Sequence, residues 1–386
     1  MTQRTLNAVA KNVTILTEHL RGTGGVQSHV RACIDLLSKS DGNVQVISID
    51  RHRNWPGIRT STDNGVKYFS VSLSRVPFLW ILSPLLLWRT LRKTDVVLVV
   101  CGHSHVGFVP ALMRLRPIVW FATIWGDELA AQAARGDQHA RRLLGHPIFP
   151  VLEMLERYVL SRSRVIANSF YTEEQVRHVL PSVDVRTILI PIDDIFFSRR
   201  PAETGTTSRE RYFLFVGRID DPRKNFIMAL EALHLALKID SSVFLYVVCP
   251  RQDGSIDSTL SSLNIQDRVI FFENASDEEL ALLYQRAVAL VLTSVQEGLG
   301  LVVFEAMARG TPCIATQCGG PERIIRENPR VGHLIERNNP AACASKMIEM
   351  LHNGDRALVR KECELVARKY FHPEKVAQQL LSEIGD

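Results

Sequence analysis

The feature that most constrains this chain is the alternation of short apolar runs with amphipathic helical segments over almost its whole length. The runs are rich in Val, Ile and Leu, as is typical of strands buried in a parallel sheet. They fall at 13–16, 43–49, 95–100, 117–124, 164–168, 187–190, 212–217, 243–248, 268–272, 289–293 and 312–316. Between the first two runs, apolar residues keep helical spacing over 26–37. The pattern predicts parallel α/β architecture.

One polar segment interrupts this alternation. Residues 198–210 contain Pro, Gly and a cluster of Thr and Ser, which is typical of an interdomain linker. The α/β pattern resumes at residue 211, and a chain of 386 residues is long enough for two domains of Rossmann size. We therefore predict a Rossmann-like domain over 1–197, a linker over 198–210 and a second Rossmann-like domain over 211–366.

Composition places the chain among ordinary globular proteins, with 46% hydrophobic and 23% charged residues. The polar start of the sequence does not resemble a signal peptide, so we expect a cytoplasmic protein. Seven scattered cysteines without a C-x-x-C pair suggest neither a disulfide framework nor a zinc site, and we expect reduced, mostly structural thiols.

The positive charge is concentrated in the first half. Ten basic and only two acidic residues lie between Arg51 and Trp120, a net charge of +8 against +5 for the whole chain. Such a segment suits an anionic partner, although a solvated basic face is an equal alternative. It surrounds the most hydrophobic run, 76–88, which is too short to span a bilayer. We expect a buried helix there, with a helix lying in the membrane interface as the alternative.

Two glutamates, Glu297 and Glu305, lie in the glycine-punctuated apolar stretch 296–312. The acid and base of a glycosidase need carboxyl groups roughly 5 to 9.5 Å apart, whereas eight residues of continuous helix separate two positions by about 12 Å. Gly298 and Gly300 instead favour a turn that leaves Glu297 on a loop and Glu305 inside a helix beginning near Gly300. We expect the carboxylates to bind opposite ends of one long ligand. For this stretch alone, two exposed glutamates beside a core helix would be preferred.

A phosphate site is expected between the two glutamates. The free N–H groups of Leu301 and Val302 at the start of the helix, together with the helix dipole, attract an anion. Arg218 and Lys224 follow the run 212–217, at the end of a strand where open α/β sheets bind ligands. Two cations there would neutralise a diphosphate leaving group. A nucleotide sugar, with hydroxyls at both ends and a diphosphate between them, has this layout.

At this point a family resemblance is evident. The segment 211–340 resembles the retaining glycosyltransferases of family four, which have the GT-B fold: two Rossmann-like domains facing each other across a cleft. The shared motifs are G-R followed by a lysine, the helix "DEELALLYQRA", "EGLGLVVFEAMARGTP" and the "GGPE" that follows. The glutamate motif with its G-T-P tail is highly specific. We also expect a C-terminal helix over 367–386 that returns to the first domain.

The resemblance assigns roles on the donor side. It implies that Glu297 contacts the transferred sugar, that Glu305 holds the ribose hydroxyls, and that Arg218 and Lys224 clamp the diphosphate. The loop 21–30 matches the family's glycine-rich loop, so Gly24 and Gly25 should approach the donor phosphates. Taken alone, this loop is a poor dinucleotide fingerprint because the third glycine is missing, and an NAD site is strongly disfavoured.

The acceptor side departs from the family pattern. Many relatives carry a histidine where this chain has Trp125, followed by Gly126 and Asp127. The usual asparagine-glycine is also absent after Ile190, so a role of that histidine cannot be transferred. His103 and His105 would share one face if the strand before them continued, and at least one of them is a candidate for contact with the acceptor. For both histidines and for Trp125, a purely structural role is the close alternative, and no metal site is expected.

These patterns together predict a retaining, metal-independent hexosyltransferase that uses a nucleotide diphosphate sugar of UDP or GDP type. The expected acceptors are sugars, glycans or lipid-linked molecules in polysaccharide or glycolipid assembly, with possible peripheral contact with the inner face of an anionic membrane and no nucleic-acid partner. Same-face attack and a short-lived ion pair are both open as mechanisms. A non-hydrolysing nucleotide-sugar epimerase and a catalytically silent sugar-nucleotide-binding protein are the alternatives.

Overall fold

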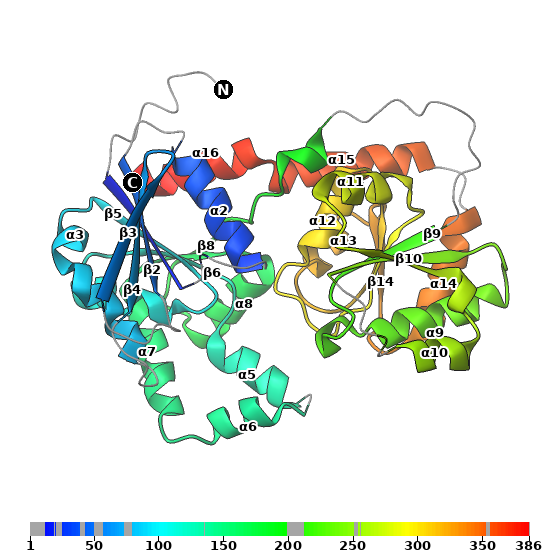
Figure 1. The fold of residues 1–386 in the computed structure, drawn as a ribbon, viewed down its shortest axis with the longest axis horizontal. Helices are drawn as coiled ribbons and strands as arrows, with labels where there is room; N and C mark the ends of the chain where they lie inside the picture. The colour runs from blue at the N-terminus through cyan, green and yellow to red at the C-terminus, as the bar shows by residue number, and fades with distance from the viewer. Residues whose placement is uncertain are drawn as a thin grey trace. The chain divides into compact units, whose positions relative to one another are not determined.

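The computed structural model describes residues 12–18, 20, 25–38, 43–49, 57–72, 79–134, 136–198, 212–250, 254, 256–352 and 356–385. The chain forms two compact units. Unit 1 comprises residues 1–191 with 376–386, and unit 2 comprises residues 192–375. Each unit is built on its own sheet with helices against it (Figure 1).

Unit 1 contains an eight-stranded sheet in the order β3-β4-β2-β1-β5-β6-β7-β8. Its strands are β1 Asn12–Thr17, β2 Asn43–Ile49, β3 Gly57–Asp63, β4 Val66–Ser72, β5 Val96–Cys101, β6 Ile118–Phe121, β7 Arg164–Ala167 and β8 Val185–Thr187. Its helices are α2 Gly25–Ser38, η1 Leu79–Leu87, α3 Trp88–Arg92, η2 Ser104–Gly107, α4 Phe108–Leu112, α5 Trp125–Ala134, α6 Gln138–Leu144, α7 Phe149–Ser161 and α8 Phe170–Val179. All neighbouring strands are parallel except β3 and β4.

Unit 2 contains a six-stranded parallel sheet in the order β11-β10-β9-β12-β13-β14. Its strands are β9 Tyr212–Val216, β10 Phe244–Cys249, β11 Val269–Glu273, β12 Leu290–Leu292, β13 Cys313–Thr316 and β14 Gly332–Ile335. Its helices are η3 Asp194–Phe197, η4 Pro222–Lys224, α9 Phe226–Leu237, α10 Asp257–Leu263, η5 Gln266–Arg268, α11 Asp277–Arg286, α12 Leu301–Ala308, α13 Glu322–Glu327, α14 Pro340–His352 and α15 Arg356–Phe371. The last helix, α16 Pro373–Gly385, begins in unit 2 and ends in unit 1.

The apolar runs correspond to buried strands, and the predicted α/β architecture with two Rossmann-like units is confirmed. Three strands were not predicted. β3 and β4 form a hairpin around Asn64 and Gly65, whose φ angles of 46° and 79° suit a tight turn. Its exposed strand β3 lacks an apolar face, and β14 is only four residues long. The prediction of a strand over 187–190 is largely wrong, because β8 covers Val185–Thr187 and ends at the first residue of that run.

The predicted domain boundaries differ from the observed units at two places. Residues 192–197 belong to unit 2, because Phe196 packs edge-on against Tyr284 of α11, with ring centroids 5.9 Å apart. Residues 367–375 also belong to unit 2, since Phe371 at the end of α15 stacks on Phe304 of α12. Of the predicted linker 198–210, only Ser198 lies within the described residues.

The expectation of one buried helix over 76–88 is wrong for the described part of that run. Residues 79–87 form a 3-10 helix containing Pro84, and a short α-helix follows. Leu87 is buried, but Leu85, Leu86 and Trp88 are 39%, 37% and 43% exposed. Among the described helices, none is both long and apolar enough to cross a bilayer. All seven cysteines are buried and free, as expected of reduced structural thiols.

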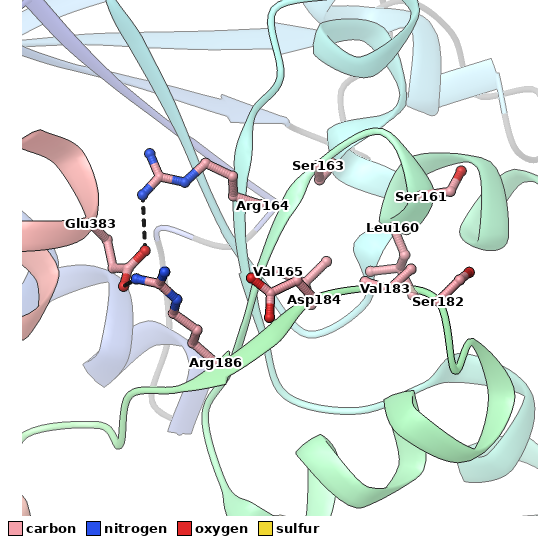
Figure 2. A pocket seen from close by; sticks show the side chains of 10 residues that line it. All are labelled: Leu160, Ser161, Ser163, Arg164, Val165, Ser182, Val183, Asp184, Arg186 and Glu383. Carbon is pink, nitrogen blue, oxygen red and sulfur yellow. Dashed lines mark hydrogen bonds and ion pairs between the residues drawn. The ribbon is translucent and has the colours of Figure 1, made fainter. Parts of the chain in front are cut away.

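The C-terminal helix is fastened to unit 1 by apolar packing and by one carboxylate. Val376, Leu380 and Ile384 of α16 join the apolar cluster between α2 and the sheet. Glu383, which is 8% exposed, receives Arg164 Nη2 at 2.9 Å and Arg186 Nη1 at 2.5 Å. Figure 2 shows the two guanidinium groups, from β7 and β8, meeting the carboxylate beside a cavity of about 220 Å³. Unit 1 is therefore completed by the last residues of the chain.

This arrangement predicts the effect of removing the charge of Glu383. Glu383→Gln should lower the free energy of unfolding by about 1 to 2 kcal/mol, because both ion pairs are lost at a buried carboxylate while the arginines stay partly hydrated. Urea denaturation measures the change. Glu174→Gln removes the same charge from an exposed position of α8 and should change stability by less than about 0.5 kcal/mol. Equal effects of the two substitutions would contradict a specific role for the arginine pair.

Candidate functional site

The candidate site in unit 2 lies where the strand order of its sheet reverses. From β9 the chain builds outward through β10 and β11 on one side, and β12, β13 and β14 lie on the other. Loops at the carboxyl ends of the strands on either side of such a switch point diverge and leave room for a ligand. The loop after β9 carries Arg218 and Lys224, and the loop after β12 carries Glu297.

The structure brings two of these predicted residues into direct contact. Lys224 Nζ lies 2.7 Å from Glu297 Oε1, and the Ser294 hydroxyl donates to the same oxygen at 2.6 Å. The two loops are also tied through the backbone, because Val295 N donates to Arg223 O at 2.7 Å. The side chains of Lys224 and Glu297 remain 22% and 12% exposed. A cation and a carboxylate are thus held side by side and accessible at the switch point.

A third loop fixes the backbone of Glu297. Its N–H donates to Cys318 O at 2.7 Å, and its carbonyl accepts from Gly320 N at 2.9 Å, so the loop after β12 pairs with the loop after β13. Gly320 must be glycine here, since a Cβ would lie 2.6 Å from the Leu299 backbone. The close approach of the two backbones at Gly320 therefore holds the Glu297 loop.

Arg218 belongs to a second ionic group in the loop after β9. Asp221, 8% exposed, accepts from Arg218 Nη2 at 2.6 Å and from Arg223 Nη2 at 2.7 Å, and it caps η4 through the Arg223 backbone N–H. Burial acts to raise the pKa of Asp221, but the hydrogen bonds from Arg223 and Arg218 outweigh it and hold the pKa well below its usual range. Both arginine side chains remain partly accessible, with Arg218 57% and Arg223 42% exposed.

The predicted helix N-terminus is present. α12 begins at Leu301 and follows Gly300, whose φ of +74° suits glycine and makes the sharp entry into the helix. The first N–H groups of a helix have no partner within it, so those of Leu301 and Val302 are available to an anion. Gly298 lies in the preceding turn. The placement of Glu297 on a loop and Glu305 inside the helix is confirmed.

Glu305 lies in a different environment from Glu297. Its Oε2 accepts a hydrogen bond from the buried Tyr284 hydroxyl at 2.9 Å. Burial raises the pKa of Glu305 to about 7, the Tyr284 hydrogen bond opposes the rise, and the charges of Asp277 and Asp193 add to it. The two glutamates are thus chemically distinct, because one is paired with a lysine and the other is bonded to a phenol.

The equivalent edge of unit 1 carries a second polar group. The strand order reverses between β1 and β5, where Glu18 follows β1 and His103 follows β5. His103 Nε2 lies 3.1 Å from Glu128 Oε2 of α5, and its Nδ1 lies 3.9 Å from Glu18 Oε1. Burial acts to lower the pKa of His103, but the Glu128 hydrogen bond and the neighbouring carboxylates outweigh it and raise the pKa. His103 is 30% exposed, so an imidazole flanked by two carboxylates lies accessible at this edge.

The other acceptor-side candidates are placed less openly. β5 ends at Cys101, so His103 and His105 do not share a strand face; His105 is buried, and its Nε2 lies 2.9 Å from Leu152 O. Trp125 begins α5 and packs against Phe149 and His105 at centroid distances of 5.5 and 5.4 Å. Its backbone N–H donates to Glu156, whose pKa burial raises to about 7. Trp125 therefore has a packing role, and it stays partly exposed.

Asp127 is exposed on α5 and accepts from Gln175 Nε2 at 3.1 Å. Gly24 lies outside the described residues, and Gly25 is the first residue of α2.

Several site residues were not predicted, and they are Glu18, Glu128, Glu156, Asp221, Arg223, Tyr284 and Ser294. Asp221 and Arg223 stand beside the predicted cations in the sequence, and this proximity could have indicated them. Within the described ranges, no group of three or more His, Cys, Asp or Glu side chains has a metal-binding arrangement.

Two parallel α/β units with charged groups at their switch points define a GT-B protein. The fold matches the sucrose-phosphate synthase of Thermosynechococcus elongatus with a TM-score of 0.69 and 20% identity, over 96% of this chain and 97% of that one. The structure of Anabaena HepE in complex with UDP and glucose matches with a TM-score of 0.69 and 15% identity, over 97% of this chain and 100% of that one. At these identities the matches show the fold.

Sequence comparison relates the chain to glycosyl transferases. Residues 197–368 match the family model described as "Glycosyl transferases group 1". An N-acetyl-alpha-D-glucosaminyl L-malate synthase of Bacillus anthracis is 26% identical, over 60% of this chain and 61% of that protein. A D-inositol 3-phosphate glycosyltransferase of Salinispora tropica is 30% identical, over 74% of this chain and 63% of that protein. The chain thus spans less than two thirds of the length of these relatives.

The raised pKa of Glu305 leads to a prediction about stability. The folded state holds this proton more tightly than an unfolded chain, where the ordinary pKa is 4.5, so the carboxyl lowers stability as the pH rises from 4.5 through about 7. Glu305→Gln cannot ionise and keeps an acceptor for Tyr284. Its stability relative to wild type should therefore rise between pH 5 and pH 8, by at most about 3 kcal/mol. Urea unfolding at both pH values measures this difference.

Glu231→Gln is the matched control, since Glu231 is an exposed residue of α9. Its stability relative to wild type should be the same at both pH values. The free energy of unfolding of Glu305→Gln relative to wild type could also be the same at pH 5 and pH 8. That result would contradict a raised pKa for Glu305 in the folded protein.

Proposed function

We propose that this chain is a glycosyltransferase that moves a sugar from a nucleotide diphosphate sugar to an acceptor hydroxyl, with retention of anomeric configuration. The Lys224–Glu297 ion pair at the switch point of unit 2 carries the proposal. It places a cation suited to a diphosphate next to a carboxylate suited to sugar hydroxyls. Unit 2 is then the donor-binding unit.

Each donor-side residue has a task in this proposal. Arg218, Lys224 and the N–H groups of Leu301 and Val302 stabilise the negative charge that grows on the departing diphosphate. Glu305 accepts hydrogen bonds from the ribose hydroxyls, and Glu297 positions the transferred sugar. Gly24 and Gly25 contribute backbone contacts to the phosphates. Because cations and helix N–H groups neutralise the leaving group, the transfer needs no metal. Attack on the same face assisted by the leaving phosphate and a short-lived ion pair both fit these tasks.

Unit 1 supplies the acceptor side. His103 is the accessible acceptor-side candidate among the two histidines, because His105 is buried and engaged with a backbone carbonyl. Glu128 can accept a hydrogen bond from an acceptor hydroxyl while His103 steadies it. Trp125 offers the exposed part of its indole for packing, and Asp127 is exposed two residues further along α5.

The substrates are proposed by class. A donor of UDP or GDP type fits a ribose carboxylate and a diphosphate clamp. The names of the relatives indicate hydroxyl acceptors that range from L-malate and D-inositol 3-phosphate to phosphatidyl-myo-inositol. We propose a sugar, glycan or lipid-linked acceptor and a place in polysaccharide or glycolipid assembly at the inner face of the membrane.

Two other functions share this architecture. A non-hydrolysing nucleotide-sugar epimerase would convert its donor in the absence of any acceptor. A silent sugar-nucleotide-binding protein would bind the donor without turnover, and the missing histidine at position 125 suggests that alternative. The paired Lys224 and Glu297 favour transfer, since a protein that only binds nucleotide needs no carboxylate at the sugar position.

The two glutamates should separate binding from transfer. We expect Glu305→Gln to weaken nucleoside diphosphate binding about tenfold, because the uncharged amide is a weaker acceptor for ribose hydroxyls than a carboxylate. Glu297→Gln should leave that binding within about twofold and reduce transfer at least tenfold, or about 1.4 kcal/mol of transition-state stabilisation. Calorimetry with UDP and GDP measures binding, and release of the diphosphate from UDP- and GDP-sugars with acceptor panels measures transfer.

Glu231→Gln should behave as wild type in both assays. The opposite ranking of the two site variants would contradict the assigned roles. Donor conversion in the absence of acceptor would favour the epimerase, and binding without turnover over the whole acceptor panel would favour the silent binder.

An exposed apolar and basic surface supports the membrane part of the proposal. Leu85, Leu86 and Trp88 are exposed on consecutive turns of η1 and α3. The guanidinium groups of Arg89 and Arg92 lie 5.5 and 5.1 Å from the Trp88 ring. An aromatic ring flanked by arginines suits the interface of a bilayer that contains acidic lipid.

This surface should bind anionic vesicles. Because each basic residue near an anionic surface contributes about 1 kcal/mol, Arg92→Ala should reduce binding to phosphatidylglycerol vesicles roughly fivefold. Trp88→Ala should reduce it at least threefold through lost apolar contact. Sedimentation with these vesicles and with phosphatidylcholine vesicles measures the effect. Leu365→Ala is the control, since Leu365 is 57% exposed but lies on α15. Equal binding to both lipids would contradict the membrane proposal.

A further inference from the structure

The group formed by Asp221, Arg218 and Arg223 has features that charge neutralisation alone does not require. One arginine would neutralise a single carboxylate, yet two share it. Asp221 has a side chain only 6% exposed, whereas those of its partners are 57% and 42% exposed. The carboxylate is therefore the buried support, and the guanidinium groups are the part that an incoming molecule can contact.

We infer that Asp221 is a positioning residue that aligns Arg218 and Arg223 at the switch point of unit 2, and that Arg223 is a further diphosphate-binding residue. The inference rests on the proposed function, in which this loop receives the diphosphate of the donor. It adds one binding residue and one supporting residue to the predicted pair Arg218 and Lys224.

The local geometry supports this arrangement. Asp221 accepts the Arg223 backbone N–H at 3.0 Å and its Nε at 3.1 Å, so both the turn and the side chain of Arg223 are fixed by one carboxylate. The carbonyl groups of Arg223 and Lys224 accept from Val295 N at 2.7 Å and Thr293 Oγ1 at 2.9 Å. The loop is thus held against the one that carries Glu297. Its guanidinium groups are oriented before any ligand arrives.

Two opposing effects decide what loss of the carboxylate does. Removing a negative charge near the site favours an anion. Losing the support frees two long side chains, which must then be ordered again when the ligand binds. Fixed guanidinium groups hold phosphate oxygens with strong, charge-assisted hydrogen bonds whose strength depends on alignment. Loss of the carboxylate removes one negative charge but frees two arginines. We therefore expect the loss of positioning to outweigh the gain in charge, so that diphosphate binding weakens.

The readout that separates these effects is selectivity between a diphosphate and a monophosphate. Two aligned arginines can engage two phosphate groups, whereas a change in net charge alters the affinity for both nucleotides in the same direction. Asp221→Asn should weaken UDP or GDP binding about tenfold, or 1.4 kcal/mol, and change binding of the corresponding monophosphate by no more than about twofold. Calorimetry on the full-length chain measures both affinities.

Further variants test whether Asp221 acts through Arg223. Arg223→Ala should weaken diphosphate binding about fivefold, and Arg223→Lys should restore part of it, since charge returns without the fork geometry. When Asp221→Asn is added to Arg223→Ala, it should reduce diphosphate affinity less than it does in wild type. One of the two partners of Asp221 is already gone in that background. Asp220→Asn is the matched control: Asp220 is the exposed neighbour, and its loss should leave both affinities within about twofold.

The outcomes separate this inference from the proposed function. If wild type binds the diphosphate and Asp221→Asn binds it equally or more tightly, the positioning role is overturned and the proposed function stands. Parallel losses of monophosphate and diphosphate binding, with a lowered melting temperature, would show a purely structural role and overturn it as well. If wild type binds neither UDP nor GDP, the proposed function fails and this inference fails with it.

Discussion

The structure of the candidate site depends on one constraint, the convergence of three loops at the carboxyl ends of adjacent parallel strands. β9, β12 and β13 are neighbours in the sheet of unit 2, so the loops that follow them meet. Backbone hydrogen bonds join the Glu297 loop to Cys318 and Gly320, and Val295 N donates to Arg223 O. The Lys224–Glu297 ion pair forms only because these loops are already held together. The backbone pairing of the loops thus places the side chains of Lys224 and Glu297 in contact.

The two glutamates show how such a frame gives similar groups different properties. Glu297 is accessible and forms an ion pair with Lys224. Polar groups of a ligand can therefore bind to Glu297 by competing with the lysine. Glu305 accepts a hydrogen bond from a buried phenol, and burial, with smaller contributions from Asp277 and Asp193, raises its pKa to about 7. Neither difference can be attributed to residue type. Each follows from the elements packed around the carboxyl group.

Unit 1 repeats the architecture with other chemistry. Its switch point carries the carboxylates of Glu18 and Glu128 around His103, where unit 2 has mainly cations. The cations of unit 2 suit phosphate groups. The carboxylates of unit 1 suit hydroxyl groups, which donate hydrogen bonds. Packing against Phe149 and His105 accommodates the large Trp125 side chain at the start of α5. The two switch points thus differ in charge although the two units share one architecture.

Local sequence patterns predicted the parallel α/β class, most buried strands, and the positions of Glu297 on a loop and Glu305 in a helix. These follow from local periodicity and from backbone conformations that few residues adopt. The tertiary structure alone decided that residues 192–197 join unit 2, that His105 is buried while His103 is accessible, and that Asp221 supports two arginines. These features depend on contacts between segments that local patterns do not connect or on the direction in which a side chain points. Periodicity specifies which face of an element is buried, but only packing specifies which neighbour covers it.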